Sequence, residues 1–162
     1  MPSEAEMIQK FWNALESDRT MMLGLQGNED VHPRPMTAMV ENDSGPIWFF
    51  TASDTEIPQA LRSSAGRAVA TFASKGHELF ATVHGGVCVD NDRFKIDELW
   101  NAYVAAWFEG GKDDPKVTLL RLDPEYAEIW LDESSFLAGI KMLLGADPKE
   151  EYKDKVAEVG LR

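Results

Sequence analysis

An arginine and several hydroxyl side chains stand at the ends of two neighbouring apolar segments early in the chain. Arg34 opens residues 34–40, and Thr51, Ser53 and Thr55 follow the apolar start of the second segment. A polar run of turn-forming residues separates the two segments, so we expect them to pair as β-strands. A guanidinium group near hydroxyl groups can bind a phosphate through charge-assisted hydrogen bonds. The sequence therefore indicates a candidate phosphate site at this strand pair.

Aromatic residues directly precede the hydroxyl groups. Trp48, Phe49 and Phe50 belong to the second segment, which we expect to be a strand over residues 47–51. Beside a phosphate site, an aromatic wall could flank a planar ring. Each of these residues could instead belong to the core, because large aromatic side chains in strands usually pack there. The sequence leaves both interpretations open.

The charge balance of the chain restricts the partners that it can bind. The 162 residues contain 16 Lys and Arg against 28 Asp and Glu, for a formal net charge of -12. Nucleic acids and anionic membranes require a basic surface, so binding to either is not expected. An anionic ligand must be held by a local cluster of donors against the overall field. The length favours a single domain over residues 1–162.

Motifs of several common sites are absent from the sequence. There is no Gly-x-Gly-x-x-Gly loop, no Gly-x-Ser-x-Gly elbow and no Cys-x-x-Cys pair. His32, His77 and His84 are too scattered to predict a metal site. Cys88 is the single cysteine, which excludes an intramolecular disulfide. The chain shows neither a signal peptide nor an apolar run of about 20 residues, so we expect a cytoplasmic protein.

The apolar periodicity predicts an α+β fold, an antiparallel β-barrel with flanking helices. Strands are expected at residues 21–25, 34–40, 47–51, 67–74, 79–89, 117–122 and 126–131. Helices are expected at residues 4–17, 57–64 and about 96–107, and in a helical C-terminal extension over about 134–162. The strand at 47–51 is apolar on both faces and is therefore expected to be central. Gly85-Gly86 predicts a bulge in its strand.

Three runs in the second half carry a resemblance to a known family. Residues 95–101 read Lys-Ile-Asp-Glu-Leu-Trp-Asn, residues 106–115 read Ala-Trp-Phe-Glu-Gly-Gly-Lys-Asp-Asp-Pro, and residues 119–124 read Leu-Leu-Arg-Leu-Asp-Pro. With the two strand segments that hold Arg34 and Trp48, they resemble the general stress protein 26 branch of the pyridoxamine 5'-phosphate oxidase-like split barrels. The resemblance implies the FMN-binding split-barrel fold, with FMN, or FAD, at the interface of a homodimer.

The resemblance also implies roles for particular residues at the two ends of the flavin. Arg34 would bind the phosphate, and Thr51 and Thr55 would add hydroxyl donors. Met36 and Thr37, on the strand that Arg34 opens, would approach the isoalloxazine ring.

The remaining implied contacts are with the ring. Backbone groups of Phe49 and Phe50 would bond its polar edge. Trp107 of the partner subunit would pack near the flavin.

Some positions depart from the pattern of the family. Ile57 stands where related sequences often place a basic residue for the phosphate, Phe80 where the oxidases have a glutamine, and His84 where serine is common. True pyridoxamine-phosphate oxidases also carry an Arg-x-His run near the C-terminus. Here residues 128–135 are acidic and contain neither Arg nor His, so oxidation of pyridoxamine phosphate is not expected.

Taken with the resemblance, the sequence predicts an FMN-binding general stress protein. A flavin-dependent oxidoreductase of unknown substrate is the first interpretation. A non-catalytic flavin carrier or sensor is the second. The third is a barrel that has lost flavin binding and acts as an interaction module.

Overall fold

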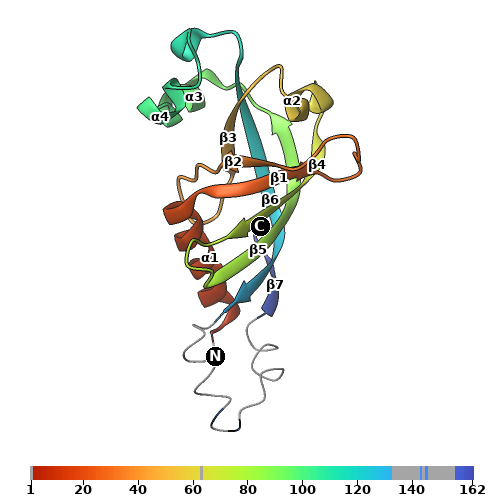
Figure 1. The fold of residues 1–162 in the computed structure, drawn as a ribbon, viewed down its shortest axis with the longest axis vertical. Coiled ribbons are helices and arrows are strands. Elements are labelled where there is room, and N and C mark those ends of the chain that lie inside the picture. The colour runs from red at the N-terminus through yellow and green to blue at the C-terminus, as the bar shows by residue number, and fades with distance from the viewer. Residues whose placement is uncertain (1, 63, 133–142, 144, 146–155) are drawn as a thin grey trace.

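The chain begins with an amphipathic helix, α1 (Glu4–Asp18), which lies along the sheet (Figure 1). The computed structural model describes residues 2–62, 64–132, 143, 145 and 156–162. A capping box starts α1: the hydroxyl of Ser3 accepts from the Glu6 amide, and the Glu6 carboxylate accepts from the Ser3 amide. The buried face of the helix consists of Met7, Phe11, Trp12 and Leu15. The predicted N-terminal helix is confirmed.

Among the described residues, seven antiparallel strands form one sheet (Figure 1). They are β1 (Thr20–Leu25), β2 (Arg34–Thr37), β3 (Ile47–Ala52), β4 (Gly66–Ala73), β5 (Leu79–Val89), β6 (Val117–Leu131) and β7 (Val156–Gly160). Their order is β2-β1-β4-β5-β6-β3, with β7 paired to β6 as well. The prediction of an α+β split barrel is confirmed.

The two end strands of this order, β2 and β3, approach each other without forming a ladder. Beyond the end of β2, Met39 and Trp48 make one antiparallel bridge, with N···O distances of 2.8 and 2.9 Å. The strand predicted at 34–40 is therefore shorter than expected, since β2 ends at Thr37. The sheet is not closed, and the candidate site lies beside the gap between β2 and β3.

The position of β3 differs from the prediction that it is central. It lies at the end of the strand order and pairs with β6 through a full ladder. Its two faces belong to two cores: Ile47 and Phe49 pack in the main core with α1, whereas Trp48 packs in a smaller cluster with Ile96 and Val104. The strand is apolar on both faces because both are covered by side chains.

The smaller cluster lies under a helical lobe formed by α3 (Arg93–Leu99) and α4 (Ala102–Ala105), followed by the 3-10 turn η1 (Gly111–Asp113). The sequence predicted one helix over about 96–107, and this is wrong. Trp100 and Asn101 have extended backbone angles, and the Asn101 side chain accepts a 2.9 Å hydrogen bond from the Val104 amide. Asn101 therefore caps a new helix, and the predicted single helix is divided into two.

The longest strands, β5 and β6, pair along most of their length. β6 runs without interruption through Pro124, where two strands were predicted. The register between β5 and β6 shifts between His84 and Gly85, so the predicted bulge is confirmed. Glycine is required at position 85, because a Cβ there would lie 2.1 Å from the carbonyl oxygen of Asp123.

The end of the chain contains a strand where a helical extension was predicted. Residues Val156–Gly160 form β7, which pairs with Tyr126–Trp130 of β6, and Val159 and Leu161 are buried. Most of the predicted extension, residues 133–142, 144 and 146–155, lies outside the described residues, so the single domain over 1–162 stays a prediction.

A short helix, α2 (Glu56–Leu61), follows β3 and corresponds to the helix predicted at 57–64. In the described part of the chain, no helix is long and apolar enough to span a membrane.

Candidate functional site

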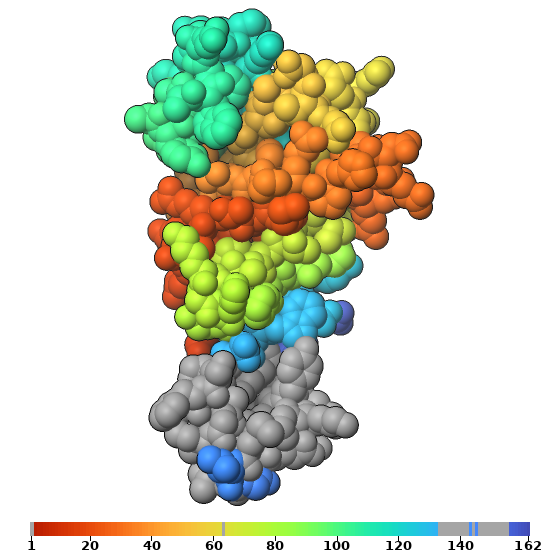
Figure 2. Space-filling model, viewed as in Figure 1, coloured from red at the N-terminus to blue at the C-terminus, as the bar shows by residue number. Residues whose placement is uncertain are grey.

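A cleft of about 540 Å³ lies beside the gap between β2 and β3. Its walls come from the start of β1, from β2, from the end of β3 and from α4, whose lobe lies next to β1 and β2 (Figures 1 and 2). Seventeen residues line it, among them the predicted Arg34, Met36, Thr37, Phe50, Thr51, Thr55 and Trp107. The structure thus gathers in one cleft all of the predicted residues except Phe49.

Arg34 stands at the first position of β2, where its partner across the ladder is Leu23. The side chain is 33% exposed, and Nη2 donates a 2.8 Å hydrogen bond to Glu56 Oε2 at the start of α2. Arg34 Nε is buried and has no hydrogen-bond partner among the described residues. A buried donor without an acceptor is unfavourable, and an anionic ligand in the cleft would supply one.

Two hydroxyl groups face the same end of the cleft. Thr51 Oγ1 and Thr55 Oγ1 are 2.9 Å apart, and Thr55 Oγ1 donates to the carbonyl oxygen of Ala52 over 2.8 Å. The turn from β3 into α2 holds this arrangement, since the Thr55 amide also bonds to Ala52. The arginine of β2, the hydroxyl of Thr51 in β3 and the hydroxyl of Thr55 before α2 are the kinds of group expected at a phosphate site.

Met36, Thr37 and Phe50 line the middle of the cleft. The Phe50 ring is half-buried and meets Trp100 edge-on, with the ring centroids 5.7 Å apart. Both backbone groups of Trp48 bond to Met39 on the β2 side of β3. Because backbone groups alternate sides along an antiparallel strand, the amide and carbonyl of Phe50 also point toward the gap. They are available to bond the polar edge of a planar ligand.

Phe49 contributes nothing to the cleft through its side chain. It is fully buried in the main core, and its backbone groups lie on the side of β3 that pairs with Leu120 of β6. The alternation that turns Phe50 toward the gap turns Phe49 away from it. The structure therefore separates two residues that the sequence grouped together.

Trp107 and Tyr103 form the outer wall of the cleft, and both are largely exposed. Trp107 lines the cleft of the same chain that holds Arg34, whereas the resemblance assigned this contact to Trp107 of the partner subunit. Tyr103 falls within the helix predicted over about 96–107 and was not among the predicted site residues. The four-residue spacing between Tyr103 and Trp107 could have indicated that both line the same wall, because residues four apart share one side of a helical segment.

The positions that depart from the pattern of the family lie outside this cleft. Ile57 is 1% exposed, packs in the main core and does not line the cleft. Phe80 and His84 lie on the outward face of β5, where His84 stacks on Tyr126 with ring centroids 4.6 Å apart.

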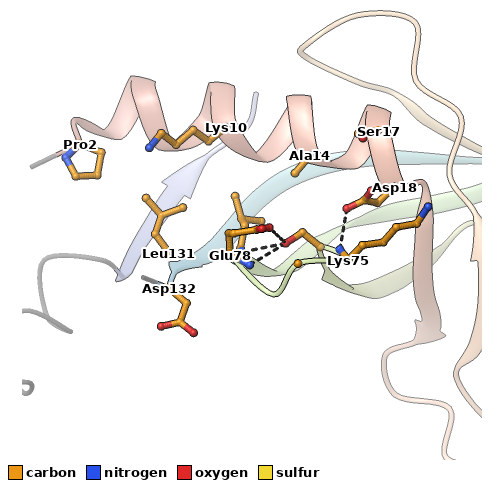
Figure 3. Close-up of a pocket in the computed structure, with 12 residues that line it drawn as sticks. Pro2, Lys10, Ala14, Ser17, Asp18, Lys75, Glu78, Leu131 and Asp132 are labelled. Carbon is orange, nitrogen blue, oxygen red and sulfur yellow. Dashed lines mark hydrogen bonds between the residues drawn. The ribbon is translucent and has the colours of Figure 1, made fainter. Parts of the chain in front are cut away.

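A larger cavity, of about 630 Å³, lies between α1, the turn from β4 to β5 and the end of β6 (Figure 3). None of the predicted site residues lines it. Several of its polar groups hold the turn: the Ser74 hydroxyl accepts from the amides of Glu78 and Leu79, and Asp18 accepts from the Lys75 amide over 2.8 Å. We therefore take the cleft at Arg34 as the candidate site.

The fold and the cleft define a split-barrel protein with a donor-rich, aromatic-walled site between its two end strands. The chain belongs to the pyridoxamine 5'-phosphate oxidase-like family, whose sequence model matches residues 6–153. Within that family, its neighbours of known structure place it in the general stress protein 26 branch. No curated protein sequence matches the chain significantly.

Three solved structures illustrate the similarity. A general stress family protein from Xanthomonas campestris pv. campestris is 56% identical over 83% of this chain and 93% of its own, with a TM-score of 0.76. The general stress FMN/FAD binding protein of Xanthomonas citri is also 56% identical, over 81% of this chain and 92% of its own, with a TM-score of 0.75. General stress protein 26 from Jannaschia sp. CCS1 is 31% identical over 96% of this chain and 99% of its own, with a TM-score of 0.81.

Proposed function

We propose that this protein is a flavoprotein that binds FMN, or FAD, in the cleft between β2, β3 and α4. The observation that carries the proposal is the placement of Arg34, the Thr51–Thr55 hydroxyl pair and the exposed Trp107 around one cleft of about 540 Å³. That volume lies in the range of about 300–1,000 Å³ that small-molecule sites occupy. The family, and the 56% identical relative described as an FMN/FAD binding protein, support a flavin as the ligand.

The residues present fit the two chemically different ends of a flavin nucleotide. At the phosphate end, Arg34 has a buried Nε without an acceptor among the described residues, Thr51 adds a hydroxyl donor, and the Thr55 hydroxyl lies 2.9 Å from that of Thr51. At the ring end, Met36, Thr37 and the backbone of Phe50 would approach the isoalloxazine ring. Trp107 would cover its exposed face, and the core residue Phe49 would only position its neighbour Phe50.

We further propose that the protein is a homodimer with the flavin at the interface. The outward face of the sheet supports this, because Met22, Phe80 and Tyr126 are between 36% and 43% exposed there. Neighbouring apolar side chains of this size on one sheet face are typical of an interface.

The first functional candidate is an oxidoreductase of unknown substrate. A bound flavin would supply the hydride or electron chemistry, and the protein would bind and orient it. A non-catalytic carrier or sensor is the second candidate, favoured by the scarcity of proton-transfer groups. Along the described lining of the cleft, the titratable side chains are Asp18, Arg19, Arg34 and Tyr103.

The test is a visible absorption spectrum of the purified protein before and after saturation with FMN and gel filtration. We expect a retained flavin spectrum near one FMN per chain, in a peak of dimer size. Bleaching of that flavin by NADH, NADPH or a substrate would support the oxidoreductase, and stable colour with every such donor would support the carrier. A protein that stays colourless after saturation with FMN and with FAD contradicts flavin binding and favours the interaction module.

A further inference from the structure

Glu56 forms an ion pair with Arg34, the arginine on which the phosphate end of the cleft depends. Its Oε2 accepts the 2.8 Å hydrogen bond from Arg34 Nη2 that links the start of α2 to β2. Glu56 directly follows Thr55, so a carboxylate lies beside the hydroxyl that would bind the same phosphate. This acid lies beside the arginine and hydroxyl groups of the phosphate end.

The other acids near this end have partners elsewhere. Asp18, in the wall of the cleft, accepts from the Lys75 amide over 2.8 Å. Asp54 lies 3.2 Å from the ammonium group of Lys116. Among the described residues, Glu56 is therefore the acid that contacts Arg34 itself.

The Arg34–Glu56 pair is exposed enough to be exchanged. The two side chains are 33% and 49% exposed, and exposed ion pairs contribute little to stability. A phosphate that reaches Arg34 must share the guanidinium with the carboxylate or displace it. In either case it meets a like charge at short range, which disfavours binding in proportion to its own charge.

We propose that Glu56 is a specificity-determining residue that competes with the phosphate of the ligand for Arg34. The phosphate that carries the most charge at this point is disfavoured most. A phosphomonoester such as that of FMN carries a charge of about −1.5 to −2 at pH 7, whereas in the diphosphate of FAD the corresponding phosphate carries a single charge and the second charge lies on the next phosphate. Glu56 thus shifts the preference of the cleft from FMN toward FAD. This inference rests on the proposed flavin binding.

The test is the affinity of Glu56→Gln for three flavins, measured by quenching of flavin fluorescence. We expect FMN to bind about three- to tenfold more tightly than to the unmodified protein. FAD should gain less than FMN, and riboflavin, which lacks a phosphate, should be unchanged. Glu29→Gln is the matched control, because it removes the same charge from an exposed position outside the cleft.

A double-mutant cycle identifies Arg34 as the group for which Glu56 competes. In the background of Arg34→Ala, Glu56→Gln should give much less than its three- to tenfold gain for FMN. A gain of the same size in both backgrounds overturns the proposal, since it would reflect net charge alone.

The outcomes separate this inference from the proposed function. If the unmodified protein binds FMN and Glu56→Gln binds it equally well or more weakly, Glu56 does not compete with the phosphate, and a weaker affinity would show that it orients Arg34 instead. If FMN binds only to Glu56→Gln, the proposal is supported in its strongest form. If neither protein binds any flavin, the proposed function fails and this inference fails with it.

Discussion

The hydroxyl groups of Thr51 and Thr55 lie 2.9 Å apart across the turn that joins β3 to α2. Thr55 has one hydroxyl proton, and it is donated to the carbonyl oxygen of Ala52. The Thr51 hydroxyl must therefore be the donor within the pair. A ligand phosphate can receive the Thr51 proton by a rotation of one hydroxyl, whereas the Thr55 proton is committed to the backbone.

This difference predicts that Thr51 contributes more to phosphate binding than Thr55. Thr51→Val removes a hydrogen bond to a charged group, which is worth about 1.5–3 kcal/mol, so FMN affinity should fall at least tenfold. Thr55→Val should have a smaller effect on FMN affinity. Riboflavin titrations of both variants are the control, and an equal loss of riboflavin affinity would show a general disturbance of the cleft.

Arg34→Ala should lower FMN affinity at least tenfold by the same reasoning. The variant also removes the buried Nε that has no acceptor among the described residues, so the free energy of unfolding should fall little or not at all. Isothermal titration with FMN and a urea melt measure the two effects. Arg93→Ala is the control, since it removes an exposed arginine outside the cleft. Unchanged FMN affinity in Arg34→Ala would contradict the phosphate assignment.

These site residues could be predicted because the relevant signals are local. Arg34 and the hydroxyl groups stand at strand ends that the apolar pattern defines, and strand pairing brings those ends together. The predicted roles of Phe49 and Phe50 were equivalent, yet alternation along β3 gives them opposite surroundings. Which of two adjacent residues faces a site depends on the register with β6, and that register is a tertiary property.

Other features depend on contacts that no local pattern contains. The apolar periodicity continues across Trp100 and Asn101, so the change to two helices depends on capping by one side chain. β7 is five residues long and forms by pairing with the free edge of β6. Glu56 is separated from Arg34 by 22 positions, and an acid beside the predicted phosphate site was the only signal of their pairing.

Ile57→Lys tests whether a basic residue at the position common in relatives would strengthen the site. Ile57 is 1% exposed in the main core, so a lysine there would bury a charge. We expect the free energy of unfolding in urea to fall by about 3 kcal/mol or more, without a gain in FMN affinity. Gln59→Lys places the same charge on the exposed side of α2 and should change stability little. Tighter FMN binding by a stable Ile57→Lys protein would contradict the buried placement.

Trp107→Ala should weaken riboflavin and FMN by similar factors, because the indole would contact the ring and not the phosphate. Trp107 is 76% exposed, so its removal should leave the melting temperature nearly unchanged. Flavin fluorescence titrations and thermal melts measure both quantities. A loss confined to FMN would place Trp107 at the phosphate end instead.

A mixed dimer of Arg34→Ala and Trp107→Ala subunits shows whether the two residues act in the same chain. Both line one cleft of a single chain, so we expect each site in the mixed dimer to carry one defect and none to bind with full affinity. If Trp107 of the partner subunit completes the site, half of the sites will keep full affinity and half will lose both contacts.

Glu125 should make the stability of the protein sensitive to acid. Its carboxylate lies between Arg67 of β4 and Arg162 near the C-terminus and bonds to both. The hydrogen bond from Arg67 is the largest cause that lowers the pKa of Glu125 from 4.5 to about 2, with Arg162 adding to it.

A carboxyl whose pKa is lower in the folded state stabilises the fold above its unfolded pKa, and that contribution is lost as the pH falls toward the folded pKa. Urea unfolding of Glu125→Gln should therefore show lower stability than the unmodified protein above about pH 4.5, and the two proteins should converge as the pH approaches 2. A difference that stays constant over this range would show that the ion pairs do not contribute to folding.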